Sequence, residues 1–594
     1  MTWRAGRLRW FSALVVACAA CPASAAAAPT VTEFTGGVTP GFSANRGPFG
    51  ITVGPDGNIW FTEVGGGDVA RLNANGSVTE FVLTSEGHPA AIAAGPDGNL
   101  WFTEPAPDNR VGRLNPSNGT ITELSSPGTP GFSANANPGE ITEGRDGNVW
   151  FTEFSAQRLA RVNSNDTVTE FPSGVTPGFS SDRIPAGITV GPDGNIWFTE
   201  IGRFGGPGGV ARFNPNHTVT EYSSGSTSGM SNGGFNGITA GPNGNIWYTR
   251  ETDHPGVGRL NPDGTATEFT YGVTPGFSSS FTAGITMGCD GNIWFSDGGS
   301  TGGVGRVNPD DTITEYPGGT TPGLSANAYA YHLTSGPDGN IWFAEPGNPG
   351  RIARLTPPAG TDTGPASGVG RHVATLGGAV RPCGQPTFYS FEYGTSIGYG
   401  NATAPVGVPG TMSAIPVSAP VARLLPDTVY HYRLVTTNKS GTTNGADHTF
   451  RTSPNLLVTL LGAFPAVFVA ESSGPSAVIT KKRHLGTTVR FTLHEAGKVR
   501  FTVTKQASGR TVKRGKQRVC VRPTRKNRSH KQCKRQVTLK GSFNINGIKG
   551  KNRFHFTGRL HGKKLPPGRY RLVATPIIGG VAAKPTSTVF QIVR

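Results

Sequence analysis

Seven tryptophans recur along the chain in one shared sequence context, and this repeat constrains the fold more than any other feature. The first copy, residues 51–63, reads Ile-Thr-Val-Gly-Pro-Asp-Gly-Asn-Ile-Trp-Phe-Thr-Glu. Successive copies lie 41 to 50 residues apart, a period typical of the four-stranded blades of a β-propeller. We therefore predict a seven-bladed β-propeller over residues 29–358. The repeated residues are Trp60, Trp101, Trp150, Trp197, Trp247, Trp294 and Trp342.

A second motif, of the type Val-Thr-Glu-Phe, marks the outer strand of each blade and also occurs seven times. One copy, residues 30–34, precedes the first repeated Trp, and none follows the last. We therefore expect residues 30–34 to complete the blade of Trp342, because such closure removes the exposed edges of the sheets. The copies lie at residues 30–34, 77–81, 120–124, 167–171, 218–222, 265–269 and 312–316.

Polar residues within each repeat allow a structural and a metal-binding interpretation. Gly54–Asn58 reads as a hairpin connection, because Gly and Asn tolerate positive φ. The repeated Asp-Gly-Asn could also suit calcium, but seven similar turns need no metal, and we favour the turn. The Glu that closes five of the Trp strands, such as Glu63 and Glu104, is likewise interpreted as structural.

Composition favours an all-β chain with more than one domain. The 594 residues are too many for a single core, and the 87 Gly and 47 Pro indicate short strands joined by tight turns. We predict two C-terminal β-sandwich domains after the propeller. Residues 361–453 resemble a fibronectin type III domain, through Phe391–Gly394 and Tyr430–Arg433 among other motifs. Residues 454–594 resemble a basic β-module of exported actinobacterial proteins.

The N-terminus predicts export. Three arginines among the first nine residues precede a mostly apolar stretch, Trp10–Cys21, and Ala23–Ala25 fits a small-x-small cleavage site. We interpret residues 1–25 as a signal peptide and expect a secreted or envelope-associated protein. A lipoprotein signal that presents Cys18 is the less favoured alternative.

Charge is distributed unevenly along the chain. Residues 29–358 carry a net charge of −16, whereas residues 454–594 hold 30 basic and 2 acidic residues, or +28. Outside the cell, the basic domain favours anionic envelope polymers as partners; a soluble surface without a specific partner is the alternative. Residues 513–535 contain 11 Lys or Arg but no aromatic residue for base stacking, so no nucleic acid is expected. We expect a monomer.

Four cysteines remain after removal of the signal. Cys520 and Cys533 are close in sequence, and an exported protein can keep a disulfide there. Cys289 and Cys383 fall in separate segments, and we expect them to be free thiols.

The propeller repeat resembles the virginiamycin B lyase family, or streptogramin lyases, through its Gly-Pro-Asp-Gly-Asn-Ile-Trp-Phe-Thr-Glu strings and its blade count. The resemblance covers about residues 29–358. It implies a seven-bladed propeller and an elimination that opens the ester of a cyclic depsipeptide. In that reaction a base removes a proton beside a carbonyl, and magnesium stabilises the developing charge.

This sequence departs from the residues that the resemblance implies. Ala283 and Tyr331 stand where the family has histidines, and Tyr329 stands where it has a glutamate. His332 is one position away from the expected histidine. Glu345 is one residue earlier than the expected metal ligand, and such a shift moves a side chain to the other face of a strand.

Two functions from different classes remain. The first is a non-enzymatic extracellular or envelope binding protein, with Asn236, Tyr329 and Tyr331 as candidate ligand-binding residues and no metal. The alternative is a magnesium-dependent C–O lyase, for which His332 and Glu345 are the weak catalytic candidates. The two differ in whether the channel mouth collects two carboxylates and a histidine within reach of one cation.

Overall fold

The computed structural model describes residues 28–594 except for short gaps at 84–86, 252–254, 300–301, 327, 454–457, 479–484, 495, 515–516 and 579–580. The predicted signal peptide, with Cys18, lies outside the described residues. The described residues form fifty β-strands and two 3-10 helices, Arg203–Gly205 and Pro242–Gly244, with no α-helix among them. The prediction of an all-β protein is confirmed. None of the helices described is long and apolar enough to cross a bilayer.

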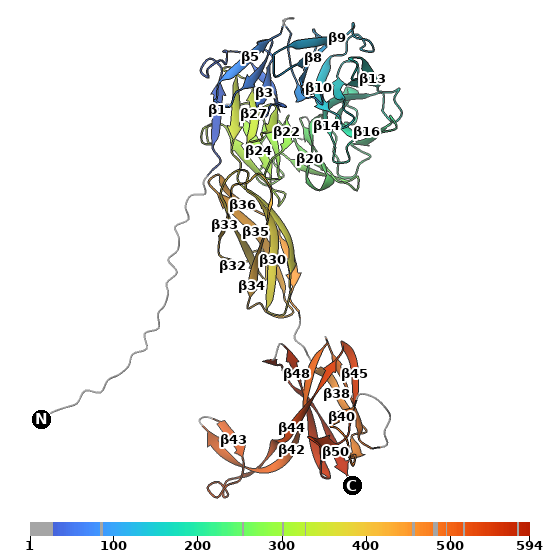
Figure 1. The fold of residues 1–594 in the computed structure, drawn as a ribbon, viewed down its shortest axis with the longest axis vertical. Helices are drawn as coiled ribbons and strands as arrows, with labels where there is room; N and C mark the ends of the chain where they lie inside the picture. Colours follow the sequence, from blue (N-terminus) through green and yellow to red (C-terminus); the bar gives the residue numbers. More distant parts are fainter. Residues whose placement is uncertain are drawn as a thin grey trace, which may run out of the picture. The chain divides into compact units, whose positions relative to one another are not determined.

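Strands β1 to β28 form seven four-stranded antiparallel sheets, as predicted for a seven-bladed propeller (Figure 1). Each blade contributes an inner, two central and an outer strand. Blades one to three contain β2 (Pro48–Val53), β3 (Ile59–Glu63), β4 (Asp68–Leu72) and β5 (Val78–Val82); β6 (Ile92–Ala94), β7 (Leu100–Glu104), β8 (Arg110–Leu114) and β9 (Ile121–Ser125); and β10 (Pro138–Glu143), β11 (Val149–Glu153), β12 (Arg158–Val162) and β13 (Val168–Pro172).

The other four blades follow the same order along the chain. Blades four to six contain β14 (Arg183–Val190), β15 (Ile196–Gly202), β16 (Gly209–Phe213) and β17 (Val219–Ser223); β18 (Phe235–Ala240), β19 (Ile246–Arg250), β20 (Gly256–Leu260) and β21 (Ala266–Thr270); and β22 (Ile285–Met287), β23 (Ile293–Asp297), β24 (Gly303–Val307) and β25 (Ile313–Pro317). Blade seven contains β26 (Leu333–Ser335), β27 (Ile341–Glu345), β28 (Arg351–Leu355) and, as its outer strand, β1 (Val31–Thr35).

The ring closes with the first strand of the chain. β1 pairs antiparallel with β28, from Val31 opposite Leu355 to Thr35 opposite Arg351. Phe34 of this strand stacks on Trp342 of the same blade, with the ring centroids 5.8 Å apart. The predicted closure by residues 30–34 is therefore confirmed.

The Asp of each repeat orders the turn and holds the Trp. In blade one, Oδ1 of Asp56 accepts hydrogen bonds from Nε1 of Trp60 at 2.9 Å and from the backbone N–H of Asn58 at 3.1 Å. Gly57, at φ +75°, takes the left-handed conformation that the turn needs. The Asp oxygens are thus used inside the turn, which supports the structural interpretation of Asp-Gly-Asn.

The hydrophobic core lies between neighbouring blades rather than within one. Trp60 and Val69 of blade one share a buried cluster with Leu100 and Phe102 of blade two. The hydroxyl of Thr62, in the Trp-Phe-Thr-Glu string, donates a 2.5 Å hydrogen bond to the carbonyl of Ala90 in the chain leading to blade two. The repeated residues therefore join each blade to the next.

Residues 360–451 form a three-stranded and a six-stranded sheet. The fibronectin type of this segment stays a prediction. Its strands are β29 (Gly360–Ser367), β30 (Val373–Arg381), β31 (Thr387–Gly394), β32 (Asn401–Ala402), β33 (Val406–Val408), β34 (Ile415–Ala422), β35 (Val429–Asn438), β36 (Gly441–Asn444) and β37 (His448–Arg451).

A disulfide joins this segment to the propeller. Cys289, in the turn before β23, is bonded to Cys383, which follows β30. The expectation of two free thiols was wrong, because the two residues are 94 positions apart in sequence and only the fold brings them together. Both belong to the first of two compact units into which the chain divides.

The second unit contains residues 451–594 and two short loops of the preceding segment. Its main sheets have four and seven strands around one hydrophobic core. Its strands are β38 (Val458–Phe464), β39 (Val467–Val469), β40 (Ala477–Val478), β41 (Thr487–Leu493), β42 (Gly497–Arg514), β43 (Gln517–Val521), β44 (Gln532–Gly547), β45 (Gly550–Phe556), β46 (Arg559–Leu560), β47 (Lys563–Lys564), β48 (Gly568–Ile578), β49 (Val581–Ala582) and β50 (Thr586–Val593).

Long strands make a ribbon in this second unit. β42 and β44 pair from Gly497 opposite Gly547 to Arg510 opposite Gln532, and β43 pairs with the far end of β42. The structure places Cys520 and Cys533 in a disulfide at that end. We call residues 504–535 the basic ribbon.

Candidate functional site

The propeller channel is lined by one equivalent position from each blade. This position directly precedes the aliphatic residue of the inner strand, and all seven residues border one cavity of about 130 Å³. Small residues are needed where inner strands pack closely: a Cβ on Gly187 or Gly237 would lie 2.2 or 2.3 Å from a carbonyl oxygen of the next blade. The seven residues are Gly50, Ala91, Glu140, Gly187, Gly237, Gly284 and His332.

The two large members of this set meet across the channel. Nε2 of His332, in blade seven, lies 3.0 Å from Oε1 of Glu140, in blade three. Nδ1 of His332 lies 3.2 Å from the backbone carbonyl oxygen of Phe49. A carbonyl and an ionised carboxylate both accept hydrogen bonds, so this geometry suits an imidazole that donates from both ring nitrogens and carries a positive charge. We call His332 and Glu140 the channel pair.

The electrostatics of the channel agree with a charged histidine. Burial lowers the pKa of His332, but the Glu140 carboxylate and hydrogen bonds to Glu140 and Phe49 raise it more, and the pKa lies above its ordinary value of 6.5. Both side chains keep some contact with solvent, with exposed fractions of 20% for His332 and 34% for Glu140. The pair is thus within reach of a molecule entering the channel.

Two aromatic side chains, Phe49 and Tyr331, pack against His332 of the channel pair. Phe49 stacks on Tyr331 with centroids 4.6 Å apart, and Tyr329 lies next to both Tyr331 and Phe281, with centroid distances of 6.3 and 5.9 Å. We call these four residues the aromatic rim. Burial, followed by the nearby charges of Glu251 and Glu140, raises the pKa of Tyr331 to about 12, so its hydroxyl stays a hydrogen-bond donor.

A second carboxylate near the rim already has a partner. The amide of Asn236, which lines the channel, donates a hydrogen bond to Oε1 of Glu251. Burial raises the pKa of Glu251, and the Asn236 hydrogen bond opposes this rise. The structure therefore gathers four of the five predicted site residues at one mouth: Asn236, Tyr329, Tyr331 and His332.

Glu345, the fifth predicted residue, lies elsewhere. Its side chain is 1% exposed inside blade seven, where Nη1 of Arg351 approaches Oε2 at 3.3 Å. Burial, and then the charge of Glu33, raises the pKa of Glu345 to about 7, although Arg351 lowers it. The one-residue shift places this carboxylate away from the channel, as the alternation of a strand requires.

Comparison with known proteins agrees with this architecture. The family model described as the virginiamycin B lyase family matches residues 39–184 and 179–364. The chain belongs to this family. No curated protein matches the chain.

Solved structures of lyases are also similar to the propeller. A streptogramin B lyase structure is 26% identical, with 55% of this chain and 97% of that chain covered and a TM-score of 0.45. Selenomethionine-substituted virginiamycin B lyase from Staphylococcus aureus has the same identity, coverage of this chain and TM-score, with 99% of that chain covered. So does a catalytically inactive variant of that enzyme with quinupristin.

The channel of this virginiamycin B lyase family member does not fit the magnesium ion that the resemblance implies. Among the described residues, the channel mouth brings together no three His, Cys, Asp or Glu ligand atoms within 4.8 Å of one another. Glu140 is paired with His332, and Glu251 with Asn236. We therefore derive no chemical step through a magnesium ion at this mouth.

Sequence reasoning missed Glu140, Phe49 and Glu251. A signal for the first was present, because Glu140 and His332 are the two exceptions at a repeat position that otherwise holds Gly or Ala. Aligning the seven inner strands would have singled out both. Glu251 lies outside the repeated motif, and only the fold brings it to the mouth.

Proposed function

We propose that this chain is an exported, non-enzymatic binding protein whose channel mouth recognises a ring-containing organic ligand. The channel pair supports this most directly. A histidine whose two nitrogens both donate is occupied as a charged anchor and is not available as a base. The aromatic rim adds flat apolar surfaces, which suit ring stacking.

A ligand at this mouth would meet a donor set with clear chemical preferences. The Tyr331 hydroxyl and the second N–H of the Asn236 amide are hydrogen-bond donors. His332, whose two N–H groups already bond to Glu140 and Phe49, would contribute positive charge. Carbonyl oxygens on a cyclic or aromatic scaffold match these donors. Cyclic depsipeptides, which carry rings and many carbonyls, are therefore the first compounds to test.

The test is incubation of the purified protein with a streptogramin B depsipeptide, with and without MgCl₂. Calorimetry should detect binding that Tyr331→Ala weakens about tenfold or more, and mass spectrometry should find the ester ring intact. Absence of binding, or binding unchanged by Tyr331→Ala, contradicts the proposal. Asn243→Ala, on the 3-10 helix before β19 and away from the channel lining, is the matched control.

One observation favours the alternative of a C–O lyase: a histidine and a carboxylate do meet in the channel of a lyase family member. In that case neutral His332 would accept the proton beside the carbonyl. Since the pKa of His332 is raised, ring opening would increase with pH through that pKa and vanish in His332→Ala. Accumulation of ring-opened product with this profile would replace the binding proposal.

The basic ribbon supports a second interaction, with anionic polymers. Residues 497–547 contain no Asp or Glu, so the Lys and Arg side chains of the basic ribbon have no acidic partner within the ribbon strands. Attachment by charge weakens as the Debye length falls from about 10 Å at 0.1 M salt to about 3 Å at 1 M. Among the described residues of the basic ribbon, the exposed cations are Lys505, Lys513, Arg518, Arg522, Arg525, Lys526, Arg528, Lys531 and Lys534.

Sedimentation of the full chain with isolated cell walls tests this interaction. We expect binding at low salt, release near 1 M, and loss of most binding when Lys526, Arg528, Lys531 and Lys534 are changed to Gln. The control changes four exposed lysines outside the ribbon: Lys549, Lys551, Lys563 and Lys564. If both variants lose the same amount of cell-wall binding, net charge alone drives the binding and the basic ribbon has no particular role.

A further inference from the structure

In three blades, one arginine pairs with two glutamates, one of them buried and the other half-buried. One glutamate ends the first central strand, the other lies on the outer strand, and the arginine begins the second central strand, directly opposite the first glutamate. In blade two, Nη1 of Arg110 lies 3.3 Å from Glu104 and 3.4 Å from Glu123. The equivalent groups are Arg158 with Glu153 and Glu170, and Arg351 with Glu345 and Glu33.

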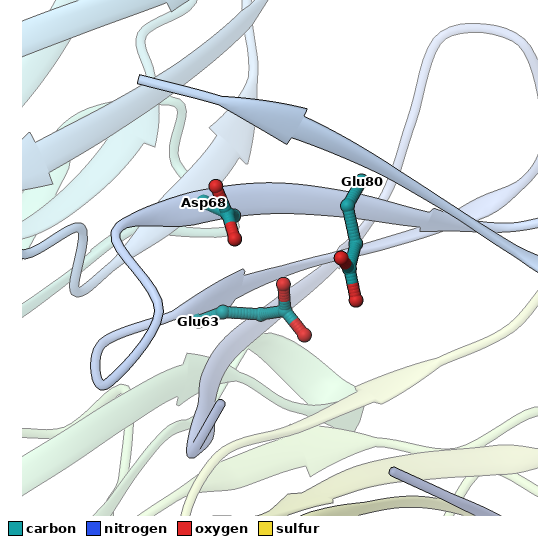
Figure 2. A group of neighbouring side chains, drawn as sticks. All are labelled: Glu63, Asp68 and Glu80. Carbon is teal, nitrogen blue, oxygen red and sulfur yellow. The ribbon is translucent and has the colours of Figure 1, made fainter. Parts of the chain in front are cut away.

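Blade one reverses the charge at this position. Asp68 lies opposite Glu63 in the strand register, where blades two, three and seven have arginine. Together with Glu80 on β5, this makes three carboxylates whose ligand oxygens all lie within 4.8 Å of one another. Figure 2 shows the three side chains, from β3, β4 and β5, turned toward a common space. We call Glu63, Asp68 and Glu80 the blade-one cluster.

Two groups outside the cluster compensate part of its charge. Nη1 of Arg46 lies 2.8 Å from Oδ2 of Asp68 and donates a 3.0 Å hydrogen bond to the carbonyl of Gly66. The backbone N–H and the hydroxyl of Ser43 donate to the two oxygens of Glu80, at 2.6 and 2.8 Å. One arginine thus faces three carboxylates.

Glu63 itself has no partner. Its side chain is 0% exposed, and neither carboxylate oxygen has a hydrogen-bond partner. Burial, followed by the charges of Glu80 and Asp68, raises the pKa of Glu63 to about 8, although Arg46 lowers it. A buried carboxylate aimed at two others and bonded to nothing requires either a proton or a cation.

We propose that the blade-one cluster binds a calcium ion, which replaces the guanidinium found in blades two, three and seven. Three oxygens that coordinate one Ca²⁺ at about 2.4 Å lie roughly 4.2 Å apart, which the observed spacing allows. The three carboxylates offer six oxygens, and calcium takes six to eight. Magnesium keeps several waters, whereas Glu63 and Asp68 are both 0% exposed to solvent.

The position of the cluster gives the ion a structural task. Ser43 and Arg46 both belong to the connection that follows the closing strand β1, and both contact the cluster. Asp68 and Glu80 hold this connection against blade one through Arg46 and Ser43. An ion bound to the two carboxylates therefore fixes their positions and, through them, the connection. Calcium would then stabilise the ring next to its closure, independently of any ligand in the channel.

Calorimetric titration of the full-length protein with calcium, after treatment with a chelator, tests the site. We expect one equivalent bound, a higher thermal midpoint with calcium than with equimolar magnesium, and at least tenfold weaker binding in Asp68→Asn. Asp68→Arg, which copies blades two, three and seven, should lose the calcium response. Glu153→Gln, in the arginine-neutralised cluster of blade three, should bind calcium like the wild type.

The opposite results overturn the proposal. The proposal is wrong if the wild type binds no calcium or if Asp68→Asn binds it as tightly as the wild type. It is also wrong if Glu153→Gln weakens calcium binding as much as Asp68→Asn does. If Asp68→Arg fails to fold, Asp68→Asn alone decides, because it keeps the shape of the side chain. A wild type that ignores calcium while Asp68→Asn raises its thermal midpoint would show that a proton, and not a metal, resolves the charge of the cluster.

Discussion

Nε2 of His332 lies 3.0 Å from Oε1 of Glu140, although the two residues belong to blades seven and three. Two blades separate them in one direction around the ring and three in the other. Their contact therefore reaches across the channel, where the five equivalent residues are Gly or Ala. The pair therefore joins two opposite sides of the channel and belongs to the lining of the candidate binding site.

Glu140→Gln should lower the pKa of His332, because it removes the carboxylate that favours the charged ring. A group whose folded pKa is raised stabilises the fold fully below its unfolded pKa, here about 6.5, and the effect disappears as pH rises through the folded pKa. The variant should lose roughly 1 kcal/mol at pH 5.5 and nothing at pH 9. NMR titration of the His332 ring gives the pKa directly; an unchanged value would contradict the pairing.

Glu153→Gln should stabilise the propeller at alkaline pH. Burial, and then the charge of Glu170, raises the pKa of Glu153 to about 8 despite Arg158, so the folded state favours the protonated acid. The free-energy cost of burying the ionised Glu153 carboxylate grows as pH rises from 4.5, its pKa in the unfolded chain, toward 8. The amide should therefore gain about 1–3 kcal/mol at pH 9 and little at pH 4, by denaturant unfolding. Glu143→Gln, exposed in the same blade, should change neither.

Replacing Cys289 and Cys383 by serine should destabilise the first compact unit. The bond closes a loop with a sequence separation of 94, for which chain entropy gives about 4–5 kcal/mol. The double variant should show a lower thermal midpoint, and a reducing agent should lower that of the wild type similarly. If alkylation and mass spectrometry find both thiols free in oxidised protein, the bond does not form.

Removal of residues 28–35 should strongly destabilise the propeller. It takes away the outer strand of blade seven, exposes the edge of β28 and removes Phe34 from Trp342. We expect a loss of more than about 3 kcal/mol. Differential scanning calorimetry of the two forms, one starting at residue 28 and one at residue 36, checks this. Equal midpoints would mean that the ring is stable without its closing strand.

Most of the propeller could be predicted because local sequence determines it. The Asp-Gly-Asn turn, the Trp strand and the outer-strand motif are each encoded within a few residues, and the displaced motif at residues 30–34 indicated the closure. The period of 41 to 50 residues indicated four-stranded blades, and the seven copies of the motif indicated their number. These features depend on turn geometry and strand alternation, which a sequence shows directly.

The candidate site was harder to predict because its residues meet only across the ring. His332 was singled out by its offset from a family position, whereas its partner Glu140 is 192 residues away in sequence. The Cys289–Cys383 disulfide shows the same difficulty. Cys289 stands where most repeats have proline, which the sequence shows, but nothing in the sequence identified Cys383 as its partner. Long-range pairs need a fold before they can be recognised.

The closing strand also sets the order in which this protein can finish folding. β1 is the first strand of the propeller to leave the ribosome, and β28, its partner, is the last. Until β28 emerges, the segment Val31–Thr35 lacks the strand with which it pairs, although all strands of the other six blades precede β28 in the chain. The propeller therefore acquires its final stability only once β28 is available, when the first of its strands to be made meets the last.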